Sequence, residues 1–372
     1  MLLLTIVDVN SMGMVNNQTC SKSNDASINF TPFTEFYRVV LRGNFVYGST
    51  SLSSNAGSGT ITISGIPANA SIVKAFLFWV EEDNDNASSG NFNGNPISGI
   101  KIAEDCTACW GTQRNALFYR DVTPFIAGNG TYNLSGFTAL QCEPSSDGPE
   151  GATLVVVWCR NSEPVRTITI YTGDVETPIT ACLFSDYSWT HTNFTASNPV
   201  LDARYLVLVG NGQNFGEFAN EYVYLNNNVI TNTINGTTVP GNGPCENGSL
   251  WDAFGGNATS WIPANSTSAT FRVNNVAAID CWHPVVSVLS VTSVDAITHD
   301  CVTQISIDEQ KDKPYIKISN KLLEISSNYD FEILSINGTK LFSYKSGNYR
   351  ISLKSGVYIL KYKNAHEKIV VK

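Results

Sequence analysis

The feature that most limits the fold of this chain is a series of short runs of β-branched and aromatic residues, each bounded by Gly, Pro, Asn or Asp. Such runs predict β-strands, because these side chains pack well on a pleated surface and the flanking residues favour turns. No long stretch has the periodicity of an amphipathic helix. Runs that are apolar throughout are typical of strands covered on both faces. The predicted strands are Thr60–Ile63, Val73–Val80, Leu154–Trp158, Thr167–Tyr171, Tyr205–Val209, Tyr222–Leu225, Ala269–Val273 and Val285–Val291.

A weak internal duplication organises these runs into two halves. Similar elements recur in the same order and at similar spacing, although few residues are identical. The first series is Ala75–Trp79, Asn93–Ile97, Arg120–Thr123, Ala127–Tyr132 and Leu154–Trp158; the second is Tyr205–Val209, Asn226–Ile230, Trp251–Asp252, Ala264–Thr270 and Val285–Val291. We therefore predict an all-β protein with two jelly-roll-like β-sandwich domains in tandem, at residues 30–175 and 176–298. Residues 1–29 form a poorly defined N-terminal leader segment.

Charge divides the chain near residue 305. The net charge is −9, but residues 1–305 hold 11 basic and 25 acidic residues, whereas residues 306–372 hold 12 basic and 7 acidic residues. The charged, proline-ended stretch before residue 315 predicts a linker at 299–314 and a separate domain at 315–372. The acidic balance argues against nucleic acid as a partner, because nucleic-acid affinity comes mainly from Lys and Arg. No apolar run is long enough to predict a transmembrane helix.

The last domain reads as a small β-meander. Asn337-Gly338 predicts a tight hairpin turn, because both residues tolerate positive φ. The segments Ile336–Lys340, Ile351–Lys361 and Lys368–Lys372 resemble the C-terminal sorting domain of proteins exported by the type IX secretion system of Bacteroidetes. The residues that carry the resemblance as its sorting motif are Gly356, Val357, Tyr358, Lys368 and Lys372.

Membership of that family would imply several properties. It would imply export through the type IX machinery, removal of the tag near the linker, and attachment to surface lipopolysaccharide or release. The expected location is extracellular or at the outer-membrane surface. The main part of the chain is also similar to an uncharacterised β-sandwich family of bacterial and archaeal surface proteins. The matching segments are Gly65–Ala68, Val73–Trp79, Asp121–Thr123 and Gly151–Val157.

Nine cysteines are scattered along the chain rather than clustered as zinc ligands. Scattered cysteines among few charged residues favour an oxidising compartment and structural disulfides. The pair Cys106 and Cys109 could form a redox dithiol, but its acidic flanks disfavour a thiolate. The disulfide candidates are Cys106, Cys109, Cys142, Cys159, Cys182, Cys245 and Cys281.

Two further patterns could bind ligands. The acidic residues Glu81, Glu82, Asp83 and Asp85 follow a predicted strand, and their hard oxygen atoms suit Ca²⁺, although a solvated acidic loop is the simpler interpretation. Calcium is the only cofactor that the sequence suggests. Five tryptophans near predicted strand ends could form a sugar-binding platform or pack in cores: Trp110, Trp189, Trp251, Trp261 and Trp282.

Catalytic signatures are lacking in the sequence. The chain has four histidines and no Gly-x-Ser-x-Gly, His-Glu-x-x-His or phosphate-binding glycine motif. His283 could act as a base with Asp280, or be a structural residue at the start of a strand. We therefore expect a non-enzymatic binding or adhesion protein whose partners are glycans or other surface proteins. The alternatives are a structural subunit of a surface layer or filament, and a polysaccharide hydrolase with two facing carboxylates.

Overall fold

The computed structural model describes residues 30–53, 56–82, 88–105, 114–138, 148–176, 186–212, 221–239, 249–275, 282–301, 315–319, 322–327, 329–362 and 365–371. The chain separates into two compact units, residues 1–303 and residues 304–372, and each is considered on its own. The described residues form antiparallel sheets and two three-residue 3-10 helices, so the prediction of an all-β fold is confirmed.

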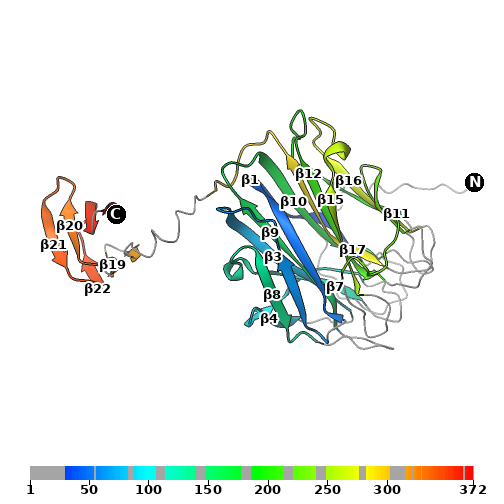
Figure 1. Cartoon of the computed structure of the whole chain (residues 1–372), viewed down its shortest axis with the longest axis horizontal. Coiled ribbons are helices and arrows are strands. Elements are labelled where there is room, and N and C mark those ends of the chain that lie inside the picture. The colour runs from blue at the N-terminus through cyan, green and yellow to red at the C-terminus, as the bar shows by residue number, and fades with distance from the viewer. Residues whose placement is uncertain are drawn as a thin grey trace, which may run out of the picture. The chain divides into compact units, whose positions relative to one another are not determined.

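The first unit, which we call the body, is built on one continuous series of nine hydrogen-bonded strands (Figure 1). Their order is β15 (Leu250–Asn257), β12 (Ala203–Gly212), β17 (His283–Thr292), β10 (Val165–Asp174), β1 (Thr31–Ser51), β9 (Gly148–Cys159), β3 (Ser71–Glu82), β7 (Asn115–Asp121) and β6 (Ile100–Asp105).

Strand β1 joins two inner sheets, because its two parts pair with different neighbours. Residues before Gly43 pair with β10, whereas Gly43 and the residues after it pair with β9. A side chain at position 43 could not fit, since a Cβ there would lie 2.0 Å from the Trp158 carbonyl oxygen. A glycine at this corner therefore lets one strand pass from one sheet to the other.

Two four-stranded outer sheets complete the body. The first outer sheet has the order β2 (Gly59–Ile63), β8 (Gly130–Ser135), β4 (Ser89–Phe92) and β5 (Asn95–Ser98); the second has the order β11 (Asp186–His191), β16 (Ala269–Asn275), β13 (Glu221–Leu225) and β14 (Asn228–Thr231). The 3-10 helices η3 (Thr123–Phe125) and η4 (Thr259–Trp261) precede β8 and β16.

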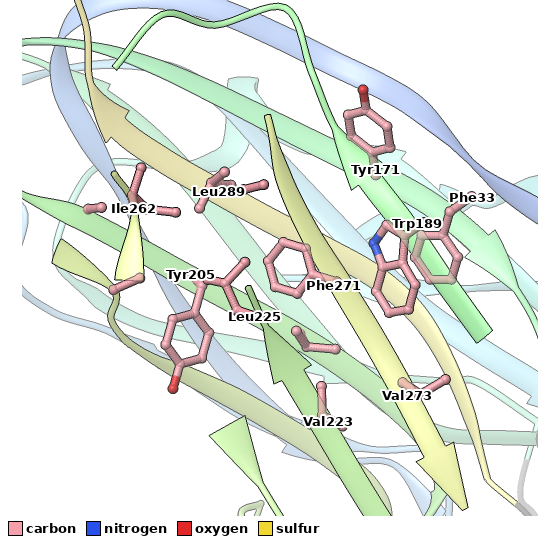
Figure 2. Close-up of a cluster of buried hydrophobic side chains, with 14 of the residues drawn as sticks. Phe33, Tyr171, Trp189, Tyr205, Val223, Leu225, Ile262, Phe271, Val273 and Leu289 are labelled. Carbon is pink, nitrogen blue, oxygen red and sulfur yellow. The ribbon is translucent and has the colours of Figure 1, made fainter. Parts of the chain in front are cut away.

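Three buried cores separate four layers of sheet. One lies between the first outer sheet and the inner strands β3 and β9, and includes Trp79 and Phe92. A second lies beneath the second outer sheet, where Trp189 and Phe271 stack on each other (Figure 2). The third, which we call the seam, lies between the two inner sheets and holds residues of both halves, Trp251 among them.

All eight strands predicted for the body occur in the structure at the predicted places. Leu154–Trp158 lies in β9, whose two faces are both buried, as the continuous apolar run indicates. The duplicated order is also visible: β3, the β4–β5 hairpin, β7, η3, β8 and β9 have counterparts in β12, the β13–β14 hairpin, β15, η4, β16 and β17. The predicted boundary at 175/176 falls just after β10, and the nine-stranded series extends to both sides of it.

The hairpin turns of the two outer sheets have the same geometry. Asn93 and Gly94 join β4 to β5 with positive φ, and Asn226 and Asn227 join β13 to β14 in the same way. In each turn the first asparagine accepts a backbone N–H of the neighbouring strand at 2.9 Å, from Asn133 in one sheet and from Thr270 in the other. These equivalent contacts show which residue of the first outer sheet corresponds to which residue of the second.

The second unit is a small two-sheet module around its own core. One sheet has the order β18 (Tyr315–Ser319), β19 (Leu322–Ser327) and β22 (Gly347–Ser352); the other has the order β21 (Lys340–Tyr344), β20 (Phe331–Ser335), β23 (Gly356–Tyr362) and β24 (Ala365–Val371). The predicted turn at Asn337-Gly338 joins β20 to β21, with Gly338 at φ 83°. Residues 299–301 of the predicted linker belong to the body, because the backbone N–H groups of Thr298 and His299 both donate to the Val40 carbonyl oxygen.

Within the part of the chain described above, no helix is both long and apolar enough to cross a membrane.

Candidate functional site

The outer surface of the second outer sheet carries two tyrosines beside charged and amide groups. Strict alternation buries Val223 and Leu225 of β13 and turns Tyr222 and Tyr224 outward. The strand register places the outward side chains in two rows across three strands. One row is Asp186, Asn274 and Tyr222; the next is Ser188, Arg272 and Tyr224. We call these six residues the tyrosine face.

Contacts within the tyrosine face hold its side chains in place. The rings of Tyr222 and Tyr224 are stacked at 5.5 Å with an interplanar angle of 18°. The Arg272 guanidinium lies 4.4 Å from the centre of the Tyr224 ring. Its Nη1 also forms an ion pair with Asp186 Oδ2 at 3.2 Å, and Asn274 Nδ2 donates to that same oxygen at 3.1 Å.

This arrangement offers apolar ring surface next to fixed hydrogen-bonding groups. Tyrosine provides a rigid amphipathic contact surface with little loss of conformational entropy. A guanidinium and a carboxylate held side by side can respectively donate to and accept from neighbouring hydroxyl groups. The chemistry matches a ligand that alternates C–H faces with hydroxyls, which describes a carbohydrate ring.

The equivalent positions of the first outer sheet are different. In the first outer sheet Asn91 pairs with Ser135, and in the second Tyr224 pairs with Arg272, so Asn91 corresponds to Tyr224 and Ser135 to Arg272. Ser89, two residues before Asn91, corresponds to Tyr222. The residues below these positions remain large and apolar, since Phe92 and Leu134 of the first sheet correspond to Leu225 and Phe271 of the second, and all four are buried.

A second group of functional side chains is buried in the seam. Glu150, Asp174 and His283, which we call the seam cluster, are each 0 % exposed. The Nδ1 atom of His283 donates to Asp174 Oδ1 at 2.7 Å, and its Nε2 lies 3.6 Å from Glu150 Oε1. Glu150 Oε2 accepts the backbone N–H of Asn211 at 2.8 Å. Glu150 belongs to one inner sheet and the other residues to the second, so the cluster connects the two halves.

β-Bulges direct two of these side chains into the seam. Trp79 pairs with Ala152 of β9, but two residues further along β3 Glu81 pairs with Pro149, so β9 has one extra residue at Glu150. A second extra residue, Val285, lies in β17 two positions after His283. Because a one-residue bulge reverses the facing of the residues beyond it, both side chains turn toward the other inner sheet.

The seam cluster is electrostatically coupled. Burial favours the neutral imidazole, but the adjacent Asp174 and Glu150 carboxylates outweigh it and raise the pKa of His283 well above 6.5. Burial raises the pKa of Asp174 to about 7, although its hydrogen bond with His283 opposes the shift. His191, buried beside the neutral partners Thr169 and Ser287, has its pKa lowered to about 3 by burial alone.

Because the cluster is closed to solvent, its chemistry is that of an internal tie between the inner sheets. Space around it is tight, since a Cβ on Gly210 would lie 2.4 Å from His283 Nε2. The sequence suggested Asp280 as the partner of His283, but Asp280 lies outside the described residues and the structure gives this role to Asp174 and Glu150.

The suggested tryptophan platform is wrong for three of its members. Trp189, Trp251 and Trp282 are at most 5 % exposed and lie in the cores. Their indole rings pack there because inner-face positions of these strands need large apolar groups. Trp261 is half-buried and stacks on Tyr205 at 5.5 Å. Trp110 lies outside the described residues.

Two of the four candidate calcium ligands lie in a strand rather than in a loop. Glu81 and Glu82 are the last residues of β3 and are buried, and Ser88 donates its hydroxyl to Glu81. Asp83 and Asp85 lie outside the described residues. Among the residues that are described, no group of three or more His, Cys, Asp or Glu is placed to hold a metal ion. Calcium at this strand end stays a prediction.

Of the seven disulfide candidates, only Cys159 is described, and it is a free, buried thiol. A disulfide at Cys159 therefore stays a prediction, since its thiol is free in this structure and lies buried in the seam. Its sulfur neighbour is Cys301, which was not among the candidates. Cys106, Cys109, Cys142, Cys182, Cys245 and Cys281 lie outside the described residues.

The residues predicted as a sorting motif lie in the last two strands of the small module. Gly356, Val357 and Tyr358 begin β23, and the Tyr358 hydroxyl donates to the Lys354 carbonyl oxygen at 2.8 Å. Lys368 is exposed on β24, and Lys372 lies outside the described residues.

Fold and site together define an all-β protein whose layered body carries a partly exposed tyrosine face and whose C-terminal residues form a separate β-module. No protein-family model matches the chain, and no curated protein is significantly similar to it.

Sequence reasoning missed both the tyrosine face and two members of the seam cluster. A signal for the first was present, because Tyr222 and Tyr224 alternate with apolar residues in a predicted strand and so must point away from the core. No local signal marks Glu150 or Asp174, since their facing depends on bulges and on pairing with distant strands.

Proposed function

We propose that this chain is a non-enzymatic, glycan-binding protein of the cell surface, and that the tyrosine face is its binding site. The observation that carries the proposal is the stacked pair Tyr222 and Tyr224 with Arg272 against one ring and Asp186 beside it. In the duplicated half the equivalent outward residues are short and uncharged, so the aromatic and charged character is not a requirement of the sandwich.

The rigidity of the sheet supports a binding role. The six residues stand on three paired strands above a closely packed core, so little ordering of the protein is needed when a ligand binds. The ion pair of Arg272 with Asp186 also keeps the guanidinium fixed against Tyr224. A preorganised aromatic and polar surface suits the shallow, hydroxyl-rich surface of an oligosaccharide.

A binding experiment on the full chain tests the proposal. Screening on a glycan array should identify oligosaccharide ligands, and calorimetric titration of the best one should give its affinity. The double variant Tyr222→Ala/Tyr224→Ala is expected to lose at least about tenfold in affinity, or roughly 1.4 kcal/mol, because the ring surface is removed.

The duplicated half provides a matched control. The double variant Ser89→Ala/Asn91→Ala changes the equivalent positions of the first outer sheet and should bind as the unmodified chain does. Unchanged affinity in the tyrosine double variant, with retained folding, would reject the tyrosine face as the site. A chain that binds no glycan at all would reject the function.

We further propose that the C-terminal module is the signal for export by type IX secretion and for attachment to surface lipopolysaccharide. The independent unit of residues 304–372 and the strand placement of Gly356 and Tyr358 support this proposal. In a host with an active type IX system, the full chain should reach the culture fluid or outer surface. A chain ending at residue 303 should stay in the periplasm, and its equal export would contradict the assignment.

A further inference from the structure

The corner where β1 passes from one inner sheet to the other also holds two thiols. Cys159 ends β9 and pairs with Gly43 across the strand ladder. Cys301 lies in the segment that leaves the body, and its Sγ donates to the Arg42 carbonyl oxygen at 3.3 Å. That oxygen also accepts the backbone N–H of Arg160 at 2.8 Å. Arg160, the residue after Cys159, and the side chain of Cys301 thus donate to the same carbonyl oxygen of Arg42.

The two sulfurs are direct neighbours in the seam. The thiol of Cys159 is fully buried, and Cys301 packs as a half-buried residue against the same apolar cluster. Cys301 is close enough to contribute to raising the pKa of the Cys159 thiol. The segment that carries Cys301 is hydrogen-bonded to β1 at Val40. The backbone N–H groups of Thr298 and His299 donate to the Val40 carbonyl oxygen, and the Val40 N–H donates to Thr298 Oγ1.

We propose that Cys159 and Cys301 are oxidised to a disulfide when the chain meets a thiol–disulfide exchange donor, and that this bond fastens residues 294–301 to the corner of β1. The proposal does not depend on glycan binding. It assigns a covalent lock to the last part of the body before the chain continues into the C-terminal module.

The chemistry proceeds by two exchange steps. The thiolate of Cys301 attacks one sulfur of the donor disulfide, whose S–S bond breaks and releases the first donor thiolate. Cys159 then loses its proton and attacks the Cys301 sulfur of the mixed disulfide, releasing the second donor thiolate. The two cysteines are oxidised by two electrons, the donor disulfide is reduced, and the two cysteine protons end on the two donor thiols.

The order of the steps follows from accessibility. Cys301 is half-buried and can meet a donor, whereas Cys159 is enclosed. Burial, with a further contribution from the neighbouring Cys301, raises the pKa of the Cys159 thiol to about 12, which makes the second step the slower one. Glutathionylated Cys301 should therefore accumulate briefly during oxidation.

Peptide mapping of the full chain tests the bond directly. The reduced chain is oxidised with oxidised glutathione, alkylated at the remaining thiols, and digested with Asp-N and trypsin. These proteases yield Asp147–Arg160 and Asp300–Ile307, which contain Cys159 and Cys301 respectively and no other cysteine. We expect the cross-linked pair of these peptides, 2 Da lighter than their sum, as the main product of both. Both peptides in alkylated form, stable glutathionylation of Cys301, or cross-links to other cysteines would overturn the proposal.

A matched variant separates this bond from any other disulfide. Reduction should lower the melting temperature of the oxidised wild-type chain by roughly 5–10 °C more than that of Cys301→Ser, because only the wild type loses the long closed loop. An equal shift in both proteins would contradict the locking role. The mapping result needs no variant and therefore stands even if Cys301→Ser folds poorly.

Discussion

The two outer sheets of the body share one architecture and differ on the side that faces away from the core. In both, a hairpin with two residues at positive φ is tied by its first asparagine to the neighbouring strand. Beneath the surface, Leu134 and Phe271 occupy equivalent buried places. On the surface, Ser135 and Asn91 stand where the second sheet has Arg272 and Tyr224.

The comparison shows which positions the fold controls. An inward side chain must fill a closely packed core, so its size and polarity are limited. An outward side chain on the same strand meets solvent and costs little to change. The outward residues of the two outer sheets can therefore differ without cost to folding, and such positions are free to be specialised for binding a ligand.

Uncoupling the two halves should have the largest effect. His283→Gln leaves the carboxylates of Glu150 and Asp174 buried without their cation, and we expect a loss of about 3–5 kcal/mol in the free energy of unfolding. Urea denaturation followed by tryptophan fluorescence measures it. The control His299→Gln, at the half-buried His299, should stay within about 0.5 kcal/mol. A small loss in His283→Gln would show that the seam is held by its apolar contacts alone.

Substitutions in the two cores should give losses of similar size in the two halves. Leu134→Ala is expected to cost about 2–5 kcal/mol and Phe271→Ala about 3–5 kcal/mol, because each leaves a cavity below its outer sheet. Thermal or urea unfolding provides the values. If one variant proved neutral, the two sandwiches would not be equivalent in packing and the comparison would fail.

The two buried histidines should give opposite dependences on pH. His283 keeps its proton in the folded state above 6.5, where the unfolded chain loses it, so its contribution to stability is present below about 6.5 and is lost as pH rises. Asp174 has its pKa raised from 3.8 to about 7, so it also makes stability fall as pH rises between these two values. His191 has the opposite effect, because its pKa is lowered to about 3 in the folded state. The unfolded chain binds this proton first, so stability is lost as pH falls below about 6.5.

Stability measured from about pH 5 to pH 8 checks these signs. In the wild type the His283 contribution should fall by at most about 1.4 kcal/mol per pH unit, the value for one proton. His283→Gln should flatten that slope, whereas His191→Gln should leave it intact and instead reduce acid destabilisation below pH 6. A wild-type slope that survives in His283→Gln would assign the effect to another group.

The outward positions should have the smallest effect on stability. Arg272→Gln removes an ion pair that is partly exposed, and Ser135→Ala changes its equivalent, so each should alter unfolding by less than about 1 kcal/mol. Glycan affinity should fall roughly tenfold in Arg272→Gln alone, which is about 1.4 kcal/mol of binding free energy. Equal affinities in the two variants would remove the functional distinction between the outer sheets.

The predictable and unpredictable parts of the site differ in how local their causes are. The strand containing Tyr222 and Tyr224 follows from its own alternation, and the turn at Asn337-Gly338 follows from the backbone freedom of Gly338, which has positive φ. The facing of Glu150 depends instead on an extra residue in β9 relative to β3, about seventy positions away in sequence. Only the pairing of the two strands shows where that bulge lies.

By itself, the sequence determined that the chain is all-β, where its main strands lie, and that a basic C-terminal segment has a different character from the acidic body. These properties depend on side-chain size, turn chemistry and charge, which act over a few residues. The tertiary structure decided that β1 joins two inner sheets at Gly43, that His283 meets Glu150 and Asp174, and that Cys159 meets Cys301. Such contacts join segments far apart in sequence, and their geometry is set only when the register, the bulges and the packing of all layers are satisfied together.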